Sequence, residues 1–169
     1  MAAGPKTARR MRPEDNVSYS EIYADLVGQP GALLPIFHRI QERLGHVPQD
    51  ALPEIAEVLN LSRAEVHGVM TFYHDFRAEA PGRCVVKICR AEACQSMGAE
   101  ALIAHAEARL GTGLHSTRAD GAVTLDPIYC LGNCALAPAI MIDGALKGRV
   151  TPARFDALIN AALDQERLA

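Results

Sequence analysis

Four of the five cysteines in this chain form two closely spaced pairs. Cys89 and Cys94 have four residues between them. Cys130 and Cys134 have three, and 35 residues separate the two pairs. Thiolates are soft ligands, and four of them can hold either a tetrahedral zinc ion or a 2Fe–2S cluster. The spacing therefore predicts one metal centre that uses both pairs.

The gaps within each pair bear on which centre this is. Zinc-ribbon pairs usually have two residues between ligands, so gaps of four and three favour the wider iron–sulfur cofactor and leave zinc open. Two disulfides are a further alternative. The basic start, MAAGPKTARRMRPED, is not followed by the apolar stretch of a secretory signal. A chain without such a signal is expected to keep its thiols reduced. We therefore expect a cytoplasmic protein with metal-binding cysteines.

Cys84 is the fifth cysteine, and it also has four residues between it and Cys89. The segment 84–89, CVVKIC, is short and rich in β-branched residues, which predicts a strand. Side chains alternate between the two faces of a strand, so Cys84 points away from the face that holds Cys89. We expect Cys84 to be a buried apolar residue and not a ligand.

Helices are predicted throughout the first half of the chain. Apolar residues recur at helical spacing, and Ser18 with Glu21 and Ser62 with Glu65 form two potential capping boxes. Gly45 follows one stripe where a C-terminal glycine belongs. The apolar stripes comprise Ile22, Tyr23, Leu26; Ile36, Phe37, Ile40, Leu44; Leu52, Ile55, Val58, Leu59; and Val66, Val69, Met70, Tyr73.

The composition changes at Ala80-Pro81-Gly82, and strands then alternate with helices. After the strand 84–89 come a ligand loop, a helix over 99–110, and four strands near 114–117, 122–125, 139–142 and 146–150. Thr151 caps a last helix that Pro152 opens. The predicted order is β-α-β-β-β-β-α, with both cysteine pairs in loops at strand ends.

This pattern predicts an α+β protein with three segments. Residues 1–17 are expected to be a disordered leader, although their arginines also suit a mitochondrial transit peptide. Residues 18–80 form a helical bundle, and residues 81–169 form the α/β domain with the cysteine pairs.

Composition and motifs exclude several functions. The net charge of −3 gives no reason to expect nucleic-acid binding, and no apolar run approaches the ~20 residues that span a bilayer, so we expect no direct membrane contact. The chain has no G-x-G-x-x-G fingerprint and no P-loop, and its six histidines are scattered. We therefore predict no catalytic residues and no nucleotide site within this chain.

Three sequence segments make a specific resemblance. HGVMTFYHDF at 67–76, ICRAEACQSMGAEAL at 88–102 and TLDPIYCLGNCALAPAIMIDG at 124–144 resemble the thioredoxin-like 2Fe–2S ferredoxin family, the 24-kDa-type subunit of NADH dehydrogenase (complex I) and its relatives. The resemblance implies a 2Fe–2S cluster in place of zinc, and a thioredoxin-like second domain. It also places Pro138 where such folds often have a cis-proline, although X–Pro bonds are usually trans.

The first ligand loop resembles one branch of this family. Arg90, Glu92 and Gln95 are similar to the gamma subunit of the soluble NAD-dependent formate dehydrogenase. That resemblance implies a one-electron carrier beside a flavoprotein subunit that binds FMN and NAD, together with a molybdenum-containing catalytic subunit. FMN, NAD and the molybdenum cofactor are then expected in the partners alone. The helical residues 18–80 are expected to dock on the flavoprotein.

Alternatives to this assignment remain open. The equivalent subunit of complex I or of a bidirectional NAD-linked hydrogenase is one, and a free ferredoxin or a zinc-stabilised interaction module is another. In each cluster-bearing case a nearby cation favours the more negative reduced cluster, and a nearby carboxylate opposes it. We therefore expect Arg90 to raise the reduction potential and Glu92 to lower it.

Overall fold

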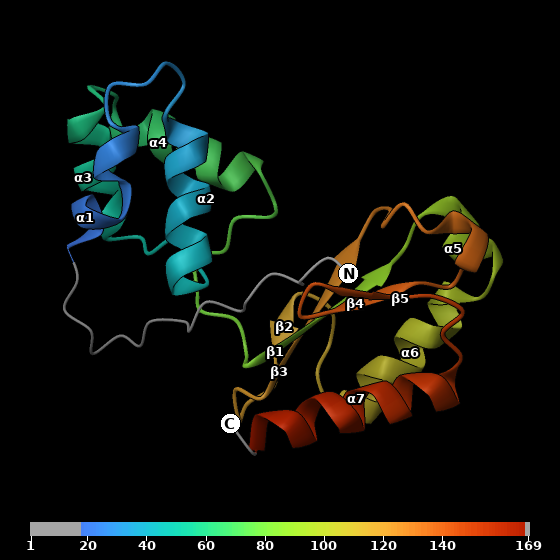
Figure 1. Ribbon diagram of the computed structural model, residues 1–169. Coiled ribbons are helices and arrows are strands. Elements are labelled where there is room, and N and C mark those ends of the chain that lie inside the picture. The colour runs from blue at the N-terminus through green and yellow to red at the C-terminus, as the bar shows by residue number, and fades with distance from the viewer. Residues whose placement is uncertain (1–17, 168–169) are drawn as a thin grey trace, which may run out of the picture. The chain divides into compact units, whose positions relative to one another are not determined.

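The computed structural model describes residues 18–167 and divides between Ala80 and Pro81 into two compact units (Figure 1). Each unit has its own hydrophobic core. None of the described helices is both long and apolar enough to cross a membrane. The first unit is all helical and the second combines a sheet with helices, so the chain has the predicted α+β class.

The first unit consists of short helices joined by tight turns. They are α1 (Tyr19–Tyr23), the 3₁₀ turn η1 (Ala24–Leu26), α2 (Leu33–Leu44), α3 (Ala51–Val58) and α4 (Arg63–Phe72). Their apolar faces meet in one core that buries Ile22, Tyr23, Leu26, Ile36, Phe37, Ile40, Leu52, Ile55, Val66 and Met70, among others. The predicted stripes therefore face inward, apart from Val58 and Tyr73, which are exposed. Tyr73 lies just past the last residue of α4.

Two of the three predicted helix ends in this unit form as expected, and the third does not. Ser62 and Glu65 form the predicted capping box at the start of α4. Gly45 ends α2 in the left-handed region, with φ of 83°, and its N–H donates to the Gln41 carbonyl. The capping box predicted at Ser18 is wrong, because the Ser18 hydroxyl contacts the hydroxyl of Ser20, 2.6 Å away, and caps nothing.

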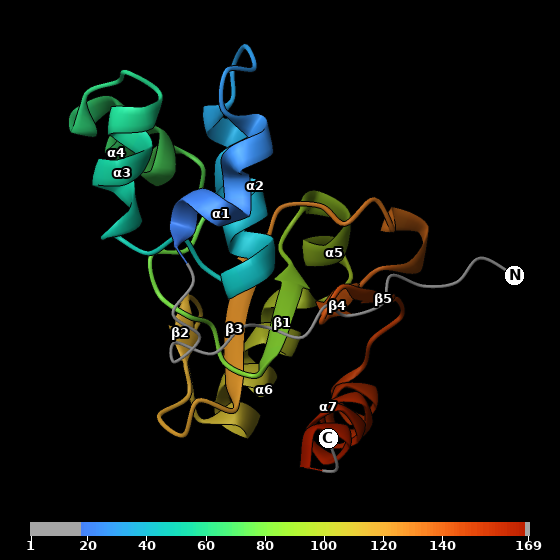
Figure 2. The same cartoon turned by 60° about the vertical axis from the view of Figure 1, so that its left-hand side comes forward.

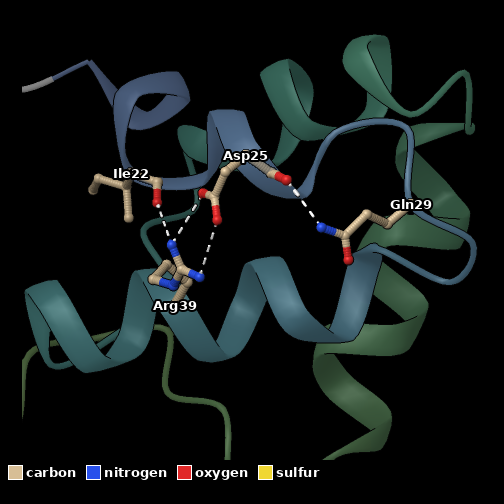
Figure 3. Close-up of polar contacts among 4 residues, drawn as sticks. All are labelled: Ile22, Asp25, Gln29 and Arg39. Atoms are coloured by element: carbon tan, nitrogen blue, oxygen red, sulfur yellow. Dashed lines mark hydrogen bonds and ion pairs between the residues drawn. The ribbon is translucent and has the colours of Figure 1, made fainter.

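Polar contacts join the first helices to the rest of this unit. Arg39 on α2 makes an ion pair with Asp25 in η1 at 3.1 Å and also donates to the Ile22 carbonyl (Figure 3). The Gln29 side chain donates to the Asp25 carbonyl at 2.9 Å, which closes the turn that follows. An exposed ion pair adds little stability on its own, so the Arg39–Asp25 pair chiefly fixes the orientation of η1 relative to α2.

The second unit is built on a five-stranded sheet in the order β2-β3-β1-β4-β5. The strands are β1 (Cys84–Cys89), β2 (Ser116–Thr117), β3 (Val123–Ile128), β4 (Ile140–Ile142) and β5 (Ala145–Lys147). The central strands β1 and β3 run parallel, as Figure 2 shows, and the other neighbours are antiparallel. The strand order along the chain is the predicted one, although β2 and β5 are shorter than predicted.

Two helices cover one face of this sheet (Figure 1). They are α6 (Ala99–Leu110) and α7 (Pro152–Arg167), and α6 has the predicted bounds. Their apolar residues share one core with Cys84, Val86 and Ile88, the inward face of β1. The Thr151 hydroxyl accepts the Arg154 N–H at 3.3 Å, so Thr151 caps α7 as predicted.

The first ligand loop differs from its prediction. Cys94 lies in a short helix, α5 (Glu92–Ser96), and not in an open loop. Cys134 begins a 3₁₀ turn, η2 (Cys134–Leu136), and the Ala137–Pro138 peptide bond that follows is cis. Segments of three to five residues show no helical periodicity, which is why the sequence pattern did not predict them.

Candidate metal centre

The parallel pairing of β1 and β3 brings the two cysteine pairs to one edge of the sheet. Cys89, the last residue of β1, lies opposite Ile128, the last residue of β3. Cys130 follows β3 by two residues, and α5, which contains Cys94, begins three residues after the end of β1. Because β4 is antiparallel to β1 and begins opposite Ile88, the second ligand loop also returns to this edge.

The four thiols form two pairs that interact with each other. The sulfurs of Cys130 and Cys134 are 3.9 Å apart, and the thiols of Cys89 and Cys94 share a hydrogen bond. Cys134 of the second pair also interacts electrostatically with both members of the first pair, Cys89 and Cys94. Within the described chain, no three His, Cys, Asp or Glu side chains stand at the spacing for one metal ion. The four thiols are thus arranged as two interacting pairs.

The two pairs differ in their exposure to solvent. Cys89 and Cys94 are 2% exposed and pack with Ala99 and Ala139 in a small apolar cluster. Cys130 and Cys134 are exposed. One side of the candidate centre therefore faces the protein interior, and the other side faces outward.

Backbone N–H groups point at the sulfurs. Cys89 accepts hydrogen bonds from the N–H groups of Ala91, Cys130 and Leu131, so the second ligand loop also contacts the first pair. The N–H of Ala139 donates to Cys94, and that of Gly132 donates to the Cys130 sulfur at 3.3 Å. Such donors stabilise negative charge on sulfur, which an iron–sulfur cluster carries on its ligands. The donor set therefore fits a 2Fe–2S cluster.

Mutual repulsion and hydrogen bonding set the acidity of the thiols. Burial acts to raise the pKa of Cys89, but the hydrogen bonds that its sulfur accepts outweigh burial and lower that pKa. Burial raises the pKa of Cys94, and the neighbouring sulfurs of Cys89 and Cys134 add to the rise. The hydrogen bond and negative charge of Cys130 raise the pKa of Cys134. Four thiolates at one place therefore need a bound cation to offset their repulsion.

Cys84 lies apart from this group. It is fully buried in the main core of the second unit, with Val86 and Ile88 on the same face of β1. The alternation predicted for the strand is therefore confirmed. Cys89 belongs to the separate apolar cluster at the sheet edge.

The charged residues of the first ligand loop have different surroundings. Arg90 makes a forked ion pair with Glu100 on α6, with nitrogen to oxygen distances of 3.1 to 3.3 Å. The Gln95 side chain donates to the Arg90 carbonyl at 2.8 Å. Glu92 is exposed. Glu100 could not be identified from the sequence, because no local pattern links it to an arginine ten residues earlier.

Known proteins that are similar to this chain indicate its family. The family model described as thioredoxin-like [2Fe-2S] ferredoxin matches residues 19–163. A subunit of the NADH-quinone oxidoreductase of Pseudomonas aeruginosa is 40% identical over 122 residues, which cover 72% of this chain and 74% of that protein. A subunit of the NADP-reducing hydrogenase of Solidesulfovibrio fructosivorans, HndA, is 27% identical over 154 residues, which cover 87% of this chain and 90% of that protein.

A solved structure gives a similar result. A chain of the NAD+-reducing [NiFe]-hydrogenase in the air-oxidized state superposes with a TM-score of 0.67 and 27% identity, over 79% of this chain. The match covers 23% of that longer chain. Because the family model spans nearly all of the described residues, the chain belongs to the thioredoxin-like [2Fe-2S] ferredoxin family, as its sequence segments indicated.

Proposed function

We propose that this chain holds one 2Fe–2S cluster through Cys89, Cys94, Cys130 and Cys134 and transfers electrons one at a time. The observation that carries this proposal is the meeting of the four thiols where parallel strands β1 and β3 end. Each cysteine pair would hold one iron. A bound cluster supplies a site that accepts and releases single electrons.

The chain's own residues prepare that site in two ways. Backbone N–H groups from both ligand loops stabilise negative charge on the sulfurs, which favours the reduced state. The buried pair, Cys89 and Cys94, is shielded from water by apolar neighbours. The exposed side of the site carries the second pair, so a redox partner can approach there. Tyr129 and Leu136 flank this side and are 72% and 39% exposed.

Metal analysis of the purified chain tests the cluster. We expect two iron and two sulfide per chain and a red-brown absorbance that dithionite bleaches. Stoichiometric zinc without visible absorbance, in protein purified without oxygen, would replace this proposal with a zinc-stabilised module.

The relatives suggest the assembly in which the cluster works. Their names describe subunits of an NADH-quinone oxidoreductase and an NADP-reducing hydrogenase. We propose that this chain is likewise an electron-transfer subunit of an NAD-linked complex, beside a flavoprotein that binds FMN and NAD. A cytoplasmic location belongs to this proposal, because metal-ligating cysteines require a compartment that keeps thiols reduced.

The specific complex we propose is an NAD-dependent formate dehydrogenase. This proposal is supported by the sequence of the first ligand loop, in which Arg90, Glu92 and Gln95 are similar to the corresponding residues of the gamma subunit of that enzyme. The catalytic partner would carry the molybdenum cofactor. The equivalent subunit of a quinone reductase or of an NAD-linked hydrogenase is the alternative that the relatives' names favour.

Purification of the tagged chain from its own cells separates these complexes. We expect co-purification of a molybdenum-containing subunit and formate-dependent reduction of NAD. Nickel with hydrogen-dependent activity would identify a hydrogenase, and quinone reduction by NADH would identify a complex I subunit. Recovery of the holo-chain alone, at several salt concentrations, would indicate a free ferredoxin.

The helical unit is our proposed docking element for the flavoprotein. Phe72 is 72% exposed at the end of α4, and its ring contacts Tyr73 edge to face at 5.1 Å. Tyr73 in turn contacts the buried ring of Phe76, so this exposed aromatic pair is supported by the core. Exposed aromatic residues on a rigid base are typical of interface hot spots.

The full-length variant Phe72→Ala tests the docking role. It should lower recovery of the flavoprotein without changing the absorbance of the cluster. Val27→Ala, which shortens another exposed apolar side chain of the same unit, is the matched control. Equal recovery with both variants would show that docking depends on another surface.

A further inference from the structure

The segment after β5 closes against the second ligand loop. The Arg149 N–H donates to the Leu136 carbonyl at 2.6 Å, and the Val150 N–H donates to the Pro138 carbonyl at 3.0 Å. These two hydrogen bonds join residues 149–150 to the end of the loop that carries Cys130 and Cys134. The second ligand loop is therefore fixed by the segment that follows β5 as well as by its own internal hydrogen bonds.

Gly148 is the residue that allows this approach. A Cβ atom at Gly148 would lie 2.7 Å from the Leu136 Cβ, 2.7 Å from the Asn133 Nδ2 and 3.0 Å from the Leu136 carbonyl oxygen. The φ of Gly148 is outside the left-handed region, so the site requires space and not a special conformation. The Asn133 amide can rotate away, but the Leu136 Cβ is attached directly to the backbone. A side chain at 148 must therefore displace the backbone of the loop.

Such a displacement would reach a ligand. Leu136 lies in the 3₁₀ turn that Cys134 begins. The Leu136 N–H donates to the Asn133 carbonyl at 2.9 Å, and the Ala137 N–H donates to the Cys134 carbonyl at 3.3 Å. Because these hydrogen bonds close the turn, its residues shift together, and a displacement of Leu136 also displaces Cys134.

We propose that Gly148 is a positioning residue for the second ligand pair: its missing side chain lets the 148–150 segment hold the Cys134 turn in the geometry that the cluster needs. This inference rests on the proposed cluster ligation by Cys130 and Cys134. Residues that orient metal ligands commonly affect metal affinity by roughly 10–100-fold when changed.

The chain offers two matched controls for Gly148→Ala. Gly82 is as crowded, since a Cβ there would lie 2.8 Å from the Val123 carbonyl carbon, but it faces the start of β3, away from the ligand edge. Gly113 has room, because the nearest atom, the Glu107 Oε1, would be 3.7 Å away. Comparison of the three alanine variants separates loss of ligand geometry from general loss of stability.

The test uses the purified holo-protein of each variant. EPR spectra of the reduced cluster report ligand geometry, the rate of iron transfer to a chelator reports retention, and thermal melting reports stability. Gly148→Ala should shift the EPR spectrum and speed iron loss by roughly tenfold. Gly113→Ala should match the wild type, and Gly82→Ala should keep the wild-type EPR spectrum even where its melting temperature falls.

Two results would overturn the inference. One is a wild-type spectrum and rate of iron loss in Gly148→Ala, and the other is an equal spectral change in Gly82→Ala. If Gly148→Ala does not accumulate in folded form, adding Leu136→Gly removes the clashing Cβ. The inference is supported if this double variant folds and retains as much cluster as the single variant Leu136→Gly. It is refuted if the double variant retains no cluster. A wild-type chain that holds no iron would refute the proposed function itself, and this inference with it.

Discussion

The guanidinium of Arg90 has a partner, which changes its expected effect on the proposed cluster. An unpaired charge ~7 Å from the cluster, in an effective dielectric of ~40–80, would contribute roughly 0.6–1.2 kcal/mol, equivalent to roughly 25–50 mV. Arg90 is instead bound by the carboxylate of Glu100 at 3.1 Å. The two opposite charges partly cancel at the cluster, so the net effect of the pair is smaller.

We therefore predict opposite shifts of the reduction potential when either partner loses its charge. Arg90→Gln should lower the potential, because the carboxylate of Glu100 then acts alone. Glu100→Gln should raise it, because the guanidinium is then uncompensated, and the double variant should lie near the wild type. EPR-monitored redox titration of the three variants measures these shifts.

The matched variant for this series is Glu92→Gln. Glu92 begins α5, two residues after Arg90, and is exposed, so solvent and salt screen its charge and its removal should raise the potential only slightly. Unchanged potentials in both Arg90→Gln and Glu100→Gln, with unaltered EPR spectra, would show that the ion pair serves only to fix α6 on the loop.

The cysteine assignment predicts which substitutions remove the cluster. Serine at Cys89, Cys94, Cys130 or Cys134 should abolish or weaken visible absorbance, because an alkoxide or hydroxyl is a poor substitute for a soft thiolate. Cys84→Ser should retain the absorbance, since Cys84 lies in the core on the other face of β1. Its buried hydroxyl should lower the stability of the unit by roughly 1–3 kcal/mol.

Iron content per chain and the visible spectrum decide this series. The assignment would fail if Cys84→Ser lost its iron while one of the other four serine variants kept a wild-type spectrum.

At the scale of elements, α1 and α3 are joined by a repeated contact. Tyr19 donates its hydroxyl to Asp50 and Tyr23 donates to Glu54, both at 2.9 Å. Two tyrosines four residues apart thus meet two carboxylates four residues apart. This spacing matches one helical turn on each side, so both bonds depend on α1 and α3 lying along each other.

These contacts predict a loss of stability at high pH. Burial and then the hydrogen bond to Asp50 raise the pKa of Tyr19 to about 12, and burial with the bond to Glu54 raises that of Tyr23. Tyrosines of the unfolded chain ionise near pH ~10. The stabilisation is therefore complete below pH ~10 and is lost as the pH rises toward 12.

Urea unfolding at several pH values on either side of pH ~10, followed by far-ultraviolet circular dichroism, measures this effect. Tyr19→Phe should be less stable than the wild type near neutral pH by roughly 0.5–1.5 kcal/mol, and its stability should fall less steeply above pH ~10. Tyr73→Phe is the control, because the Tyr73 side chain is exposed and packs through its ring against Phe72 and Phe76. Parallel pH curves for Tyr19→Phe and the wild type would contradict the explanation.

Local patterns predicted most elements, and the exceptions depend on distant contacts. The helices 33–44 and 99–110 and the strand 84–89 follow from periodicity and from capping residues close by in the chain. The four candidate ligands could be identified because two pairs of cysteines, with four and three residues between their members, are typical of a metal site. The pairing of Arg90 with Glu100 and the approach of Gly148 to Leu136 arise only when separate elements pack, so sequence spacing could not predict either.

At the scale of the whole molecule, the two units have separate cores. The candidate ligands all lie in the second unit, and the metal that they bind would stabilise that folded unit but not its unfolded form. Iron should therefore stabilise the second unit and leave the helical unit unchanged.

Hydrogen exchange of the full chain with and without iron measures this difference. Removal of iron should speed exchange in the second unit, most of all in the ligand loops, while amides of α2 and α4 keep their rates. A similar acceleration in α2 and α4 would show that the two units fold as one cooperative block.

The connection between the units is short and is fixed at both ends. The Arg77 N–H donates to the Gln41 side chain, and the Gly82 N–H donates to the buried Thr124 hydroxyl at 2.6 Å. Only residues 78–81 lie between these anchors, and a chain of that length spans at most roughly 17 Å. If the helical unit is bound to a partner, the cluster unit is confined near it at an effective concentration in the millimolar range. A donor and acceptor confined in this way would exchange electrons at a rate independent of how dilute the complex is in the cell.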